Sequence, residues 1–390
     1  MIRTGPRFSS PPAASHSIEA RTPAYTEEMN RRDLFRAAAA AAVTPAIASA
    51  SDVRFETEIV RLKLRHTWTT VMSSSDYRDV LYVRYTRDGI TGHGEGAPIV
   101  RYKEDAKSAQ TALESVRALV LAADPWEFEK LMARVFHEIQ GANAAKAALD
   151  IALMDWAAQK LGVPLYRYFG LDPADAPVTT FSIGMDNPAM TRDKVHEAEP
   201  YKVLKIKVGL DTDEATIGAV RSVTGKPLRV DANEGWTDKE VALRKIEWLA
   251  KNGVEFVEQP MPAAQLDDMH WVHERSPLPL IADESVLHPA DIPKLLGAYD
   301  GINVKLDKCG GIMEAYREIQ IAKALGMKTM LGCMISSSCT VTAAAHLSPL
   351  VDYADLDGNL LISNDPWRGV TVEHGKLVLP NRPGLGLQAT

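Results

Sequence analysis

Cysteine is scarce in this sequence, and the few cysteines form no metal or redox motif. The 390 residues include three, Cys309, Cys333 and Cys339, without C-x-x-C spacing or clustered histidines. An odd number argues against a fully paired disulfide framework, and the spacing argues against a zinc site. We expect these thiols to be small buried side chains beside a pocket.

Excess charge of one sign and long apolar runs are also lacking. The formal net charge is −7, and acidic and basic side chains are mixed along the chain. No basic stripe would attract a nucleic acid, so a polyanionic partner is not expected. Beyond residue 50, no apolar run is long enough to span a membrane. With 46% hydrophobic residues, the chain is typical of globular proteins and long enough for a barrel and a smaller domain.

The first 50 residues have the order of an export signal. Residues 30–36 read N-R-R-D-L-F-R and precede an alanine-rich stretch that ends in A-S-A at residues 48–50. Paired arginines, a weakly hydrophobic stretch and small residues in this order are typical of a twin-arginine signal peptide. The alternative is an alanine-rich helix after a polar tail. Residues 1–28 are a Ser/Pro-rich leader that we expect to be disordered or not translated. We therefore predict a periplasmic protein without stable membrane association.

Residues 51–176 predict an α+β domain. Alternating apolar residues over 53 to about 68 and over 80–85 predict antiparallel strands, and Arg87-Asp88-Gly89 predicts a hairpin turn. The polar, Ser-rich stretch 69–78 predicts a mobile loop and a candidate lid. Residues 104–170 have helical periodicity, with the clearest amphipathic run at 148–158 and stop signals at Gly162 and Pro164.

After Pro177 the pattern changes to short apolar runs that alternate with helices. Parallel neighbouring strands need a crossover of a dozen or more residues, so this pattern predicts a (β/α)₈ TIM-like barrel over residues 177–366. Residues 367–390 contain two further apolar runs, which we expect to return to the first domain. The eight runs start at Val178, Val203, Leu228, Val254, Leu280, Gly301, Lys328 and Tyr353.

Ionic residues close these runs at nearly even spacing. From Lys207 through Asp231, Glu258 and Asp283 to Lys305, the intervals are 24, 27, 25 and 22 residues. Each interval is about one strand plus one helix. These groups would therefore sit at successive carboxyl ends of barrel strands and face one pocket.

Three of these groups predict a metal site. Asp231, Glu258 and Asp283 would repel one another without a cation, and ligation by oxygen alone suits one Mg²⁺ per subunit better than Zn²⁺. Asn233 and Glu284 are candidates for holding the ligands in place. Taken singly, each carboxylate is more simply a helix cap or a solvated charge, but the series at strand ends favours the metal.

Three lysines predict acid/base chemistry. Lys205 and Lys207 are two residues apart on a strand, so both face the barrel interior, where repulsion and desolvation favour a neutral amine. Lys305 lies four strands later, on the opposite side of the ring. Two lysines that flank one α-carbon can remove a proton from one face and return it to the other, through an enediolate stabilised by the cation. Such a site inverts a stereocentre.

Asp355 and Asp357 repeat the i, i+2 spacing on the eighth strand. Two carboxylates turned toward the pocket predict a cationic ligand group, and the α-ammonium of a peptide is the obvious candidate. The alternative is an Asp-rich turn before Gly358.

Over about residues 53–385 the chain resembles the enolase superfamily, and specifically its dipeptide epimerases of the L-Ala-D/L-Glu type. The motifs are K-I-K at 205–207, D-A-N-E at 231–234, E-Q-P at 258–260, A-D-E-S at 282–285, N-V-K-L-D-K-C-G-G at 303–311, L-G-C-M at 331–334 and D-L-D-G at 355–358. The resemblance implies a first domain that caps the barrel, with the loop 69–78 closing over the side chains of a dipeptide substrate.

The resemblance also implies roles for single residues. Lys207 and Lys305 would be the acid/base pair, and Lys205 would tune the first or neutralise the substrate carboxylate. Mg²⁺ would be held by the three carboxylates, and the dipeptide ammonium by Asp355 and Asp357. Ser182, Met334 and Ser336 would line the pocket.

One departure leaves the substrate open. Relatives that prefer an acidic second residue carry an arginine in the capping loop, where this chain has Ser73-Ser74-Ser75. Arg78 or Arg101 are candidate substitutes, and neutral, hydrophobic and cationic dipeptides remain alternatives. Peptides released from the cell wall are one source for an exported enzyme, and a homo-oligomer is compatible with the sequence.

Two other functions compete. A muconate-lactonising cycloisomerase or an o-succinylbenzoate synthase would have no use for Asp355 and Asp357. A non-catalytic exported peptide-binding protein would not need both Lys207 and Lys305.

Overall fold

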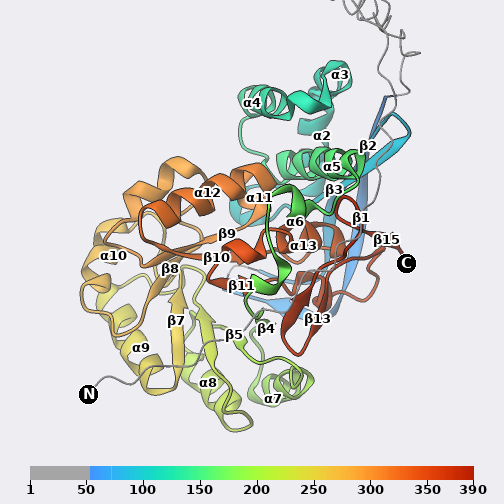
Figure 1. The fold of residues 1–390 in the computed structure, drawn as a ribbon. Coiled ribbons are helices and arrows are strands. Elements are labelled where there is room, and N and C mark those ends of the chain that lie inside the picture. Colours follow the sequence, from blue (N-terminus) through green and yellow to red (C-terminus); the bar gives the residue numbers. More distant parts are fainter. Residues whose placement is uncertain (1–52, 72) are drawn as a thin grey trace, which may run out of the picture. The chain divides into compact units, whose positions relative to one another are not determined.

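The computed structural model describes residues 53–71 and 73–390. The predicted leader and export signal at residues 1–50 lie outside the described residues. Within the described part, an antiparallel sheet with its helices precedes an eight-stranded parallel sheet (Figure 1). None of the helices there is both long and apolar enough to cross a membrane.

The first part begins with a three-stranded antiparallel sheet, β1 (Arg54–Thr69), β2 (Ser74–Arg87) and β3 (Ile90–Gly96). The predicted hairpin turn lies between β2 and β3. Asp88 and Gly89 have φ of 54° and 74°, as a two-residue turn of this hand requires.

The predicted loop at 69–78 is wrong over most of its length. Thr69 pairs with Ser74 and Trp68 with Ser75, so only residues 70–73 connect β1 to β2. Side-chain hydrogen bonds across the strands, from Thr67 to Asp76 at 2.6 Å and between Thr69 and Ser74 at 2.9 Å, accommodate the polar residues. Pairing with β1 therefore overrides the loop-like composition.

The helix α5 (Asn143–Leu161) lies between this sheet and the barrel. It contacts β2 and β3 and also the barrel helices α11 (Leu306–Cys309) and α12 (Ile312–Ala324) (Figure 1). Residues 144–158 are all buried. The run 148–158, predicted to be amphipathic, therefore has no face exposed to solvent. Gly162, at φ 72°, ends the helix as predicted. The other helices here are α2 (Ala106–Ser115), α3 (Arg117–Ala122), α4 (Phe128–Glu138) and α6 (Leu165–Tyr168).

Three alternating glycines let the sheet approach α5. A Cβ on Gly92, Gly94 or Gly96 would lie 1.9–2.0 Å from a carbonyl oxygen of α5. The small side chains of α5 and the glycines of β3 therefore allow direct contact between the two backbones.

We expect Gly94→Ala to destabilise the protein by about 3 kcal/mol, because the added methyl group meets the rigid backbone of α5. Thermal or urea unfolding measures this. Gly218→Ala in α8 (Asp213–Arg221) is the matched control, because a Cβ there has nothing within 4 Å. It should stabilise by about 0.5–1 kcal/mol. Equal effects of the two substitutions would contradict the packing argument.

The second part confirms the predicted barrel. Its strands follow chain order, all neighbours are parallel, and a bridge from Thr179 to Ala354 joins the last strand to the first. The strands are β4 (Phe181–Ile183), β5 (Leu204–Lys207), β6 (Leu228–Asp231), β7 (Val254–Glu258), β8 (Leu280–Ala282), β9 (Gly301–Val304), β10 (Lys328–Gly332) and β11 (Tyr353–Asp355).

Helices connect most of these strands. They are α7 (Pro188–Glu197), α8, α9 (Lys239–Lys251), α10 (Leu266–His273), α11 with α12, and α13 (Ser338–Ala345). Between β8 and β9 the crossover is instead a 3₁₀ helix, Pro289–Leu295, which contains Pro293.

The C-terminal segment contacts both parts. The hairpin of β13 (Thr371–Glu373) and β14 (Lys376–Val378) meets the start of the barrel, where Lys376 bridges Val178. Farther on, Gly384 bridges Pro164, and the amide of Leu385 donates to Asp155 of α5 at 2.7 Å. Strands β12 (Trp367–Arg368) and β15 (Gln388–Ala389) pair with each other.

Candidate active site

The barrel brings the predicted ionic residues to one end. Lys207, Asp231 and Glu258 are the last residues of β5, β6 and β7, while Asp283 and Lys305 directly follow β8 and β9. All five are at least 92% buried. A cavity of about 620 Å³ is lined by Lys205, Lys207, Asp283 and Lys305 together with residues of the N-terminal domain.

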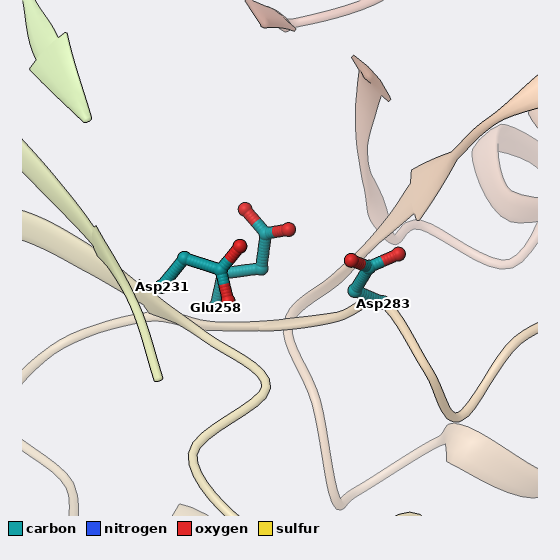
Figure 2. Close-up of side chains that lie close together, drawn as sticks. All are labelled: Asp231, Glu258 and Asp283. Atoms are coloured by element: carbon teal, nitrogen blue, oxygen red, sulfur yellow. The ribbon is translucent and has the colours of Figure 1, made fainter. Parts of the chain in front are cut away.

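The three carboxylates predicted as metal ligands form a compact row. One oxygen of each of Asp231, Glu258 and Asp283 lies within 4.8 Å of the others (Figure 2). An oxygen-only donor set at this spacing, buried from water, fits a hard divalent cation.

In each carboxylate of the row, one oxygen accepts a hydrogen bond from a neighbouring group. Asp231 Oδ1 accepts from the Asn233 amide at 2.9 Å. Glu258 Oε1 accepts from Asn303 Nδ2 at 2.9 Å, and Asp283 Oδ1 accepts from Lys308 Nζ at 2.5 Å. We call the side chains of Asn303 and Lys308 and the backbone N–H of Asn233 the backing donors.

The other oxygen of each carboxylate meets a lysine ammonium. Lys207 Nζ lies 2.6 Å from Asp231 Oδ2, and Lys305 Nζ lies 2.6 Å from Asp283 Oδ2. Lys205 Nζ lies 2.7 Å from Glu258 Oε2. Each of the three buried carboxyl groups is thus in contact with one lysine side chain.

The pKa values of the three carboxyl groups reflect their burial and their closeness to one another and to the lysines. Burial, and then the charge of Asp231, raise the pKa of Glu258 to about 8. Burial also opposes the ionisation of Asp231 and Asp283, but the lysines outweigh it and hold both pKa values below their ordinary range. The row therefore does not hold three full charges at neutral pH without additional positive charge.

The two predicted acid/base lysines lie at opposite ends of the row. The strand order is β5, β6, β7, β8, β9. Lys207 contacts the ligand on β6, Lys305 contacts the ligand after β8, and Glu258 of β7 stands between them. A substrate carbon above the row would therefore have one amine on each flank.

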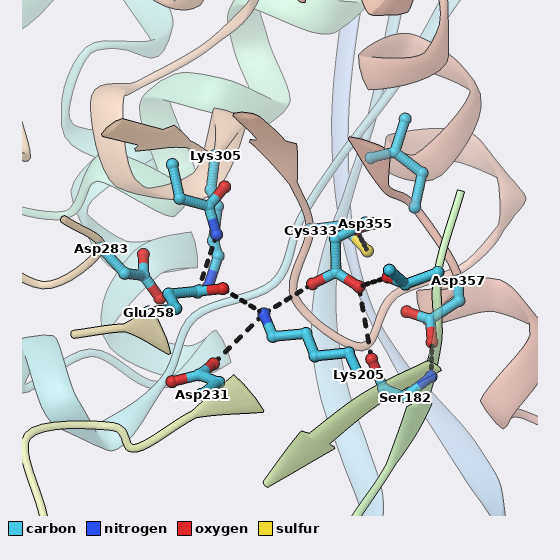
Figure 3. A network of polar contacts seen from close by, with 12 residues as sticks. Ser182, Lys205, Asp231, Glu258, Asp283, Lys305, Cys333, Asp355 and Asp357 are labelled. Carbon is cyan, nitrogen blue, oxygen red and sulfur yellow. Dashed lines mark hydrogen bonds and ion pairs between the residues drawn. The ribbon is translucent and has the colours of Figure 1, made fainter. Parts of the chain in front are cut away.

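Lys205 does not favour the neutral amine that its proximity to Lys207 predicted. Its Nζ lies 2.7 Å from Asp355 Oδ2 and 3.2 Å from Asp231 Oδ2, in addition to Glu258 (Figure 3). Burial opposes the charge, but the neighbouring carboxylates, Asp355 first, raise the pKa of Lys205 well above its ordinary value. Carboxylates outnumber lysines around it, so Lys205 is a fixed positive charge.

Asp355 and Asp357 have unequal surroundings. Asp355 accepts from Thr180 and from Ser182 Oγ and pairs with Lys205. Asp357 accepts from the Ser182 amide at 2.6 Å and has no lysine partner among the described residues. Burial and the charge of Asp355 raise the pKa of Asp357 to about 7. Asp357 is therefore the better placed of the two to receive a new cationic group.

The remaining predicted pocket residues differ in position. Ser182, Met334, Asn233 and Glu284 line the cavity, and Asn233 Nδ2 donates to Glu284 Oε1 at 3.1 Å. Ser336 is not among the lining residues; it is buried and donates to the Met334 carbonyl at 3.2 Å. Cys333 lines the cavity, while Cys309 and Cys339 are buried away from it.

Sequence reasoning missed Asn303 and Lys308. Asn303 precedes Lys305 by two residues on β9 and so shares its face of the strand. Lys308 follows Lys305 by three residues in the one-turn helix α11, which brings both lysines to Asp283. The spacing was visible in the sequence, but the conformation after the strand was not.

The two candidate arginines of the N-terminal domain have different partners. Arg101 forms a double hydrogen bond with Glu234, at 2.6 and 2.8 Å, and is thereby neutralised. Arg78 lines the cavity beside Ser73, Ser74 and Ser75. Among the described residues Arg78 has no carboxylate partner, and its guanidinium donates to the Tyr77 carbonyl at 3.0 Å.

Known proteins resemble this chain over most of its length. Residues 52–170 match the family model of the mandelate racemase/muconate lactonizing enzyme N-terminal domain, and residues 190–390 match the enolase C-terminal domain-like model. An L-Ala-D/L-Glu epimerase of Bacteroides thetaiotaomicron is 45% identical, over 84% of this chain and 85% of that protein. An L-Ala-D/L-amino acid epimerase of Pedosphaera parvula is 47% identical, over 84% and 96%.

A solved structure is similar over nearly its whole length. The dipeptide epimerase of Enterococcus faecalis, complexed with Mg and the dipeptide L-Leu-L-Tyr, superposes with a TM-score of 0.81 at 32% identity, over 86% of this chain and 99% of that one. The chain therefore belongs to the enolase superfamily, and within it to the family of the dipeptide epimerases.

Proposed function

We propose that this protein is an isomerase that inverts the α-carbon of the second residue of a dipeptide. The observation that carries the proposal is the placement of Lys207 and Lys305 at opposite ends of one carboxylate row. One amine removes the α-proton from one face, and the other delivers a proton to the opposite face. Neither cyclisation nor binding alone requires a base on each side.

Asp231, Glu258 and Asp283 would hold one Mg²⁺, whose charge would release the lysines from their ion pairs and offset the charge that develops on the substrate carboxylate. Lys205 supplies a fixed positive charge beside the same carboxylate. Asp357, with Asp355 behind it, would bind the α-ammonium of the dipeptide. The substrate is thus held at both ends, with its second α-carbon between the two amines.

The proposal is tested by incubating the purified protein with Mg²⁺ and a panel of L,L-dipeptides and separating the stereoisomers of the product. We expect L,D-dipeptides to form from a subset of the panel. Inversion of none of them, while a lactone or a dehydrated acid is formed from another substrate class, would overturn the assignment.

We also propose that the preferred second residue is acidic. Arg78 is a half-buried guanidinium on the cavity wall with no carboxylate partner among the described residues, whereas Arg101 is already paired. A substrate carboxylate would supply that partner.

We expect Arg78→Leu to lower kcat/KM for L-Ala-L-Glu about 10- to 100-fold, the value of one hydrogen bond to a charged group. The same substitution should leave kcat/KM for L-Ala-L-Leu within a few-fold. Arg84→Leu, on the same strand and paired with Glu56 and Glu58 away from the cavity, is the control. A uniform loss for both dipeptides would remove Arg78 from substrate selection.

Asp357 gives the reaction a pH dependence. Only its carboxylate form can pair with an ammonium, and in the free protein its pKa is about 7. At saturating Mg²⁺, kcat/KM should therefore fall about tenfold per unit as the pH drops below 7. Asp357→Asn should lower kcat/KM and abolish this limb of the pH profile. A limb that persists in the variant belongs to another group.

We propose export by the twin-arginine route, from the order of residues 30–50. Fractionation of the native host tests this, with a mature protein that begins near residue 51 expected in the periplasm. Recovery in the spheroplast cytosol with residues 30–50 intact would refute it.

A further inference from the structure

The carboxylate row has a feature that bears on which cation it accepts. Every member has one oxygen engaged by a backing donor, at 2.9, 2.9 and 2.5 Å for Asp231, Glu258 and Asp283. The other oxygen of each residue lies 2.6–2.7 Å from Nζ of Lys207, Lys205 or Lys305, so each residue has one oxygen free for a cation that displaces these ammonium groups.

Lys308 is the most completely fixed of the backing donors. Its side chain is 1% exposed. Its Nζ donates to Asp283 Oδ1 and to the Asp283 carbonyl at 2.5 Å, and to the Asn303 carbonyl at 2.8 Å. Three acceptors satisfy all three donors of the ammonium group. Lys308 does not line the cavity and so has no place in the proton transfers.

Asn303 does the same for Glu258 from the neighbouring strand. Its Nδ2 holds Glu258 Oε1 at 2.9 Å, and its carbonyl is one of the three acceptors of Lys308. The two side chains therefore form one assembly behind two adjacent ligands.

We propose that Lys308 and Asn303 are positioning residues that restrict Glu258 and Asp283 to one oxygen each, and that this restriction selects Mg²⁺ over Ca²⁺. Mg²⁺ takes six ligands and keeps waters, so three single oxygens leave positions for water and substrate. Ca²⁺ prefers six to eight oxygens and often takes both oxygens of a carboxylate. A carboxylate oxygen that accepts a hydrogen bond from a backing donor is not free to coordinate Ca²⁺. Mg²⁺ needs only one oxygen from each carboxylate, so the same hydrogen bond weakens Mg²⁺ binding little.

The inference rests on the proposed function for the identity of the cation, but its test does not use activity. Isothermal titration of the full-length protein without substrate gives the dissociation constants for Mg²⁺ and Ca²⁺. Lys308→Met removes the ammonium group, and Asn303→Leu removes the amide without a change in charge. Both cations carry the same charge, so the charge lost in Lys308→Met shifts both constants alike and cancels in their ratio.

We expect the ratio of the Ca²⁺ to the Mg²⁺ dissociation constant to fall about tenfold in each variant, in the range seen when partners of metal ligands are removed. Lys328→Met, exposed at the other end of the barrel, should leave the ratio unchanged. Ratios within twofold of the parent in both variants would overturn the proposal. If Lys308→Met does not fold, judged by circular dichroism, Asn303→Leu decides by the same criterion. An inactive enzyme with the expected ratios would contradict the proposed function alone.

Discussion

Replacing either Lys207 or Lys305 by alanine should lower the rate of dipeptide inversion by about 10³-fold or more, because each variant loses the base on one side of the substrate carbon. The two variants should differ in what they retain. In D₂O, one should still exchange the α-proton of the L,L-dipeptide and the other that of the L,D-dipeptide. Proton NMR of the two separate stereoisomers measures this.

Lys328→Ala is the control for this experiment, because Lys328 is an exposed lysine on β10, paired with Asp352 at 2.9 Å. It should invert dipeptides at the parental rate. If both active-site variants exchange both stereoisomers, or if either still inverts at a rate near that of the parent, the assignment of one lysine to each face is wrong.

Removal of the metal should lower the rate of dipeptide inversion as strongly as the loss of either lysine. A chelator should abolish inversion, and Mg²⁺ should restore it.

Glu258→Gln should lower the rate by about 10³-fold, because it takes a charged ligand from the row. Without metal, Glu258 is largely protonated at pH 7, since its pKa is about 8, and glutamine resembles that neutral form. The variant should therefore melt within a few degrees of the metal-free parent but lose the rise in melting temperature that Mg²⁺ produces.

Glu255→Gln is the matched control, because Glu255 lies on the same strand and pairs with Arg229 at 3.0 Å, away from the row. It should retain both activity and stabilisation by Mg²⁺. A Glu258→Gln protein that is still stabilised by Mg²⁺ as much as the parent would show that the cation binds elsewhere.

The barrel and the site were predictable because both depend on chain spacing. Eight apolar runs at intervals of one strand and one helix leave few other folds. Because carboxyl ends of parallel strands share one edge, a residue such as Asp231, which closes its run, must face the same pocket as Lys305. These features follow from local pattern and ring closure alone.

The predictions that failed depended on contacts between elements, which the composition of a segment does not show. Ser74 and Ser75 look like a loop until they pair with β1. The alanine-rich helix α5 looks amphipathic until β3 and α11 cover its two sides. Composition carries no information on strand pairing or on the packing of one element against another. These contacts decide the strand at residues 74–78 and the burial of α5.

The electrostatics of the site were also beyond the sequence. The spacing of Lys205 and Lys207 predicts repulsion, but Asp355, which comes from the far end of the barrel domain, pairs with Lys205 and reverses the effect. Likewise, Arg101 and Glu234 are 133 residues apart, so their mutual neutralisation could not be anticipated. Of the two candidate arginines, Arg78 is the one without a carboxylate partner among the described residues.

The most direct measurement of the two-base mechanism is the isotope content of the first product formed in D₂O. With two lysines acting on opposite faces, newly formed L,D-dipeptide should carry deuterium at the inverted carbon from the earliest time points, because its proton comes from the amine that did not remove the original one. Product that retains the original hydrogen would mean that a single group acts on both faces, and the assignment of Lys207 and Lys305 to opposite faces of the substrate would be wrong.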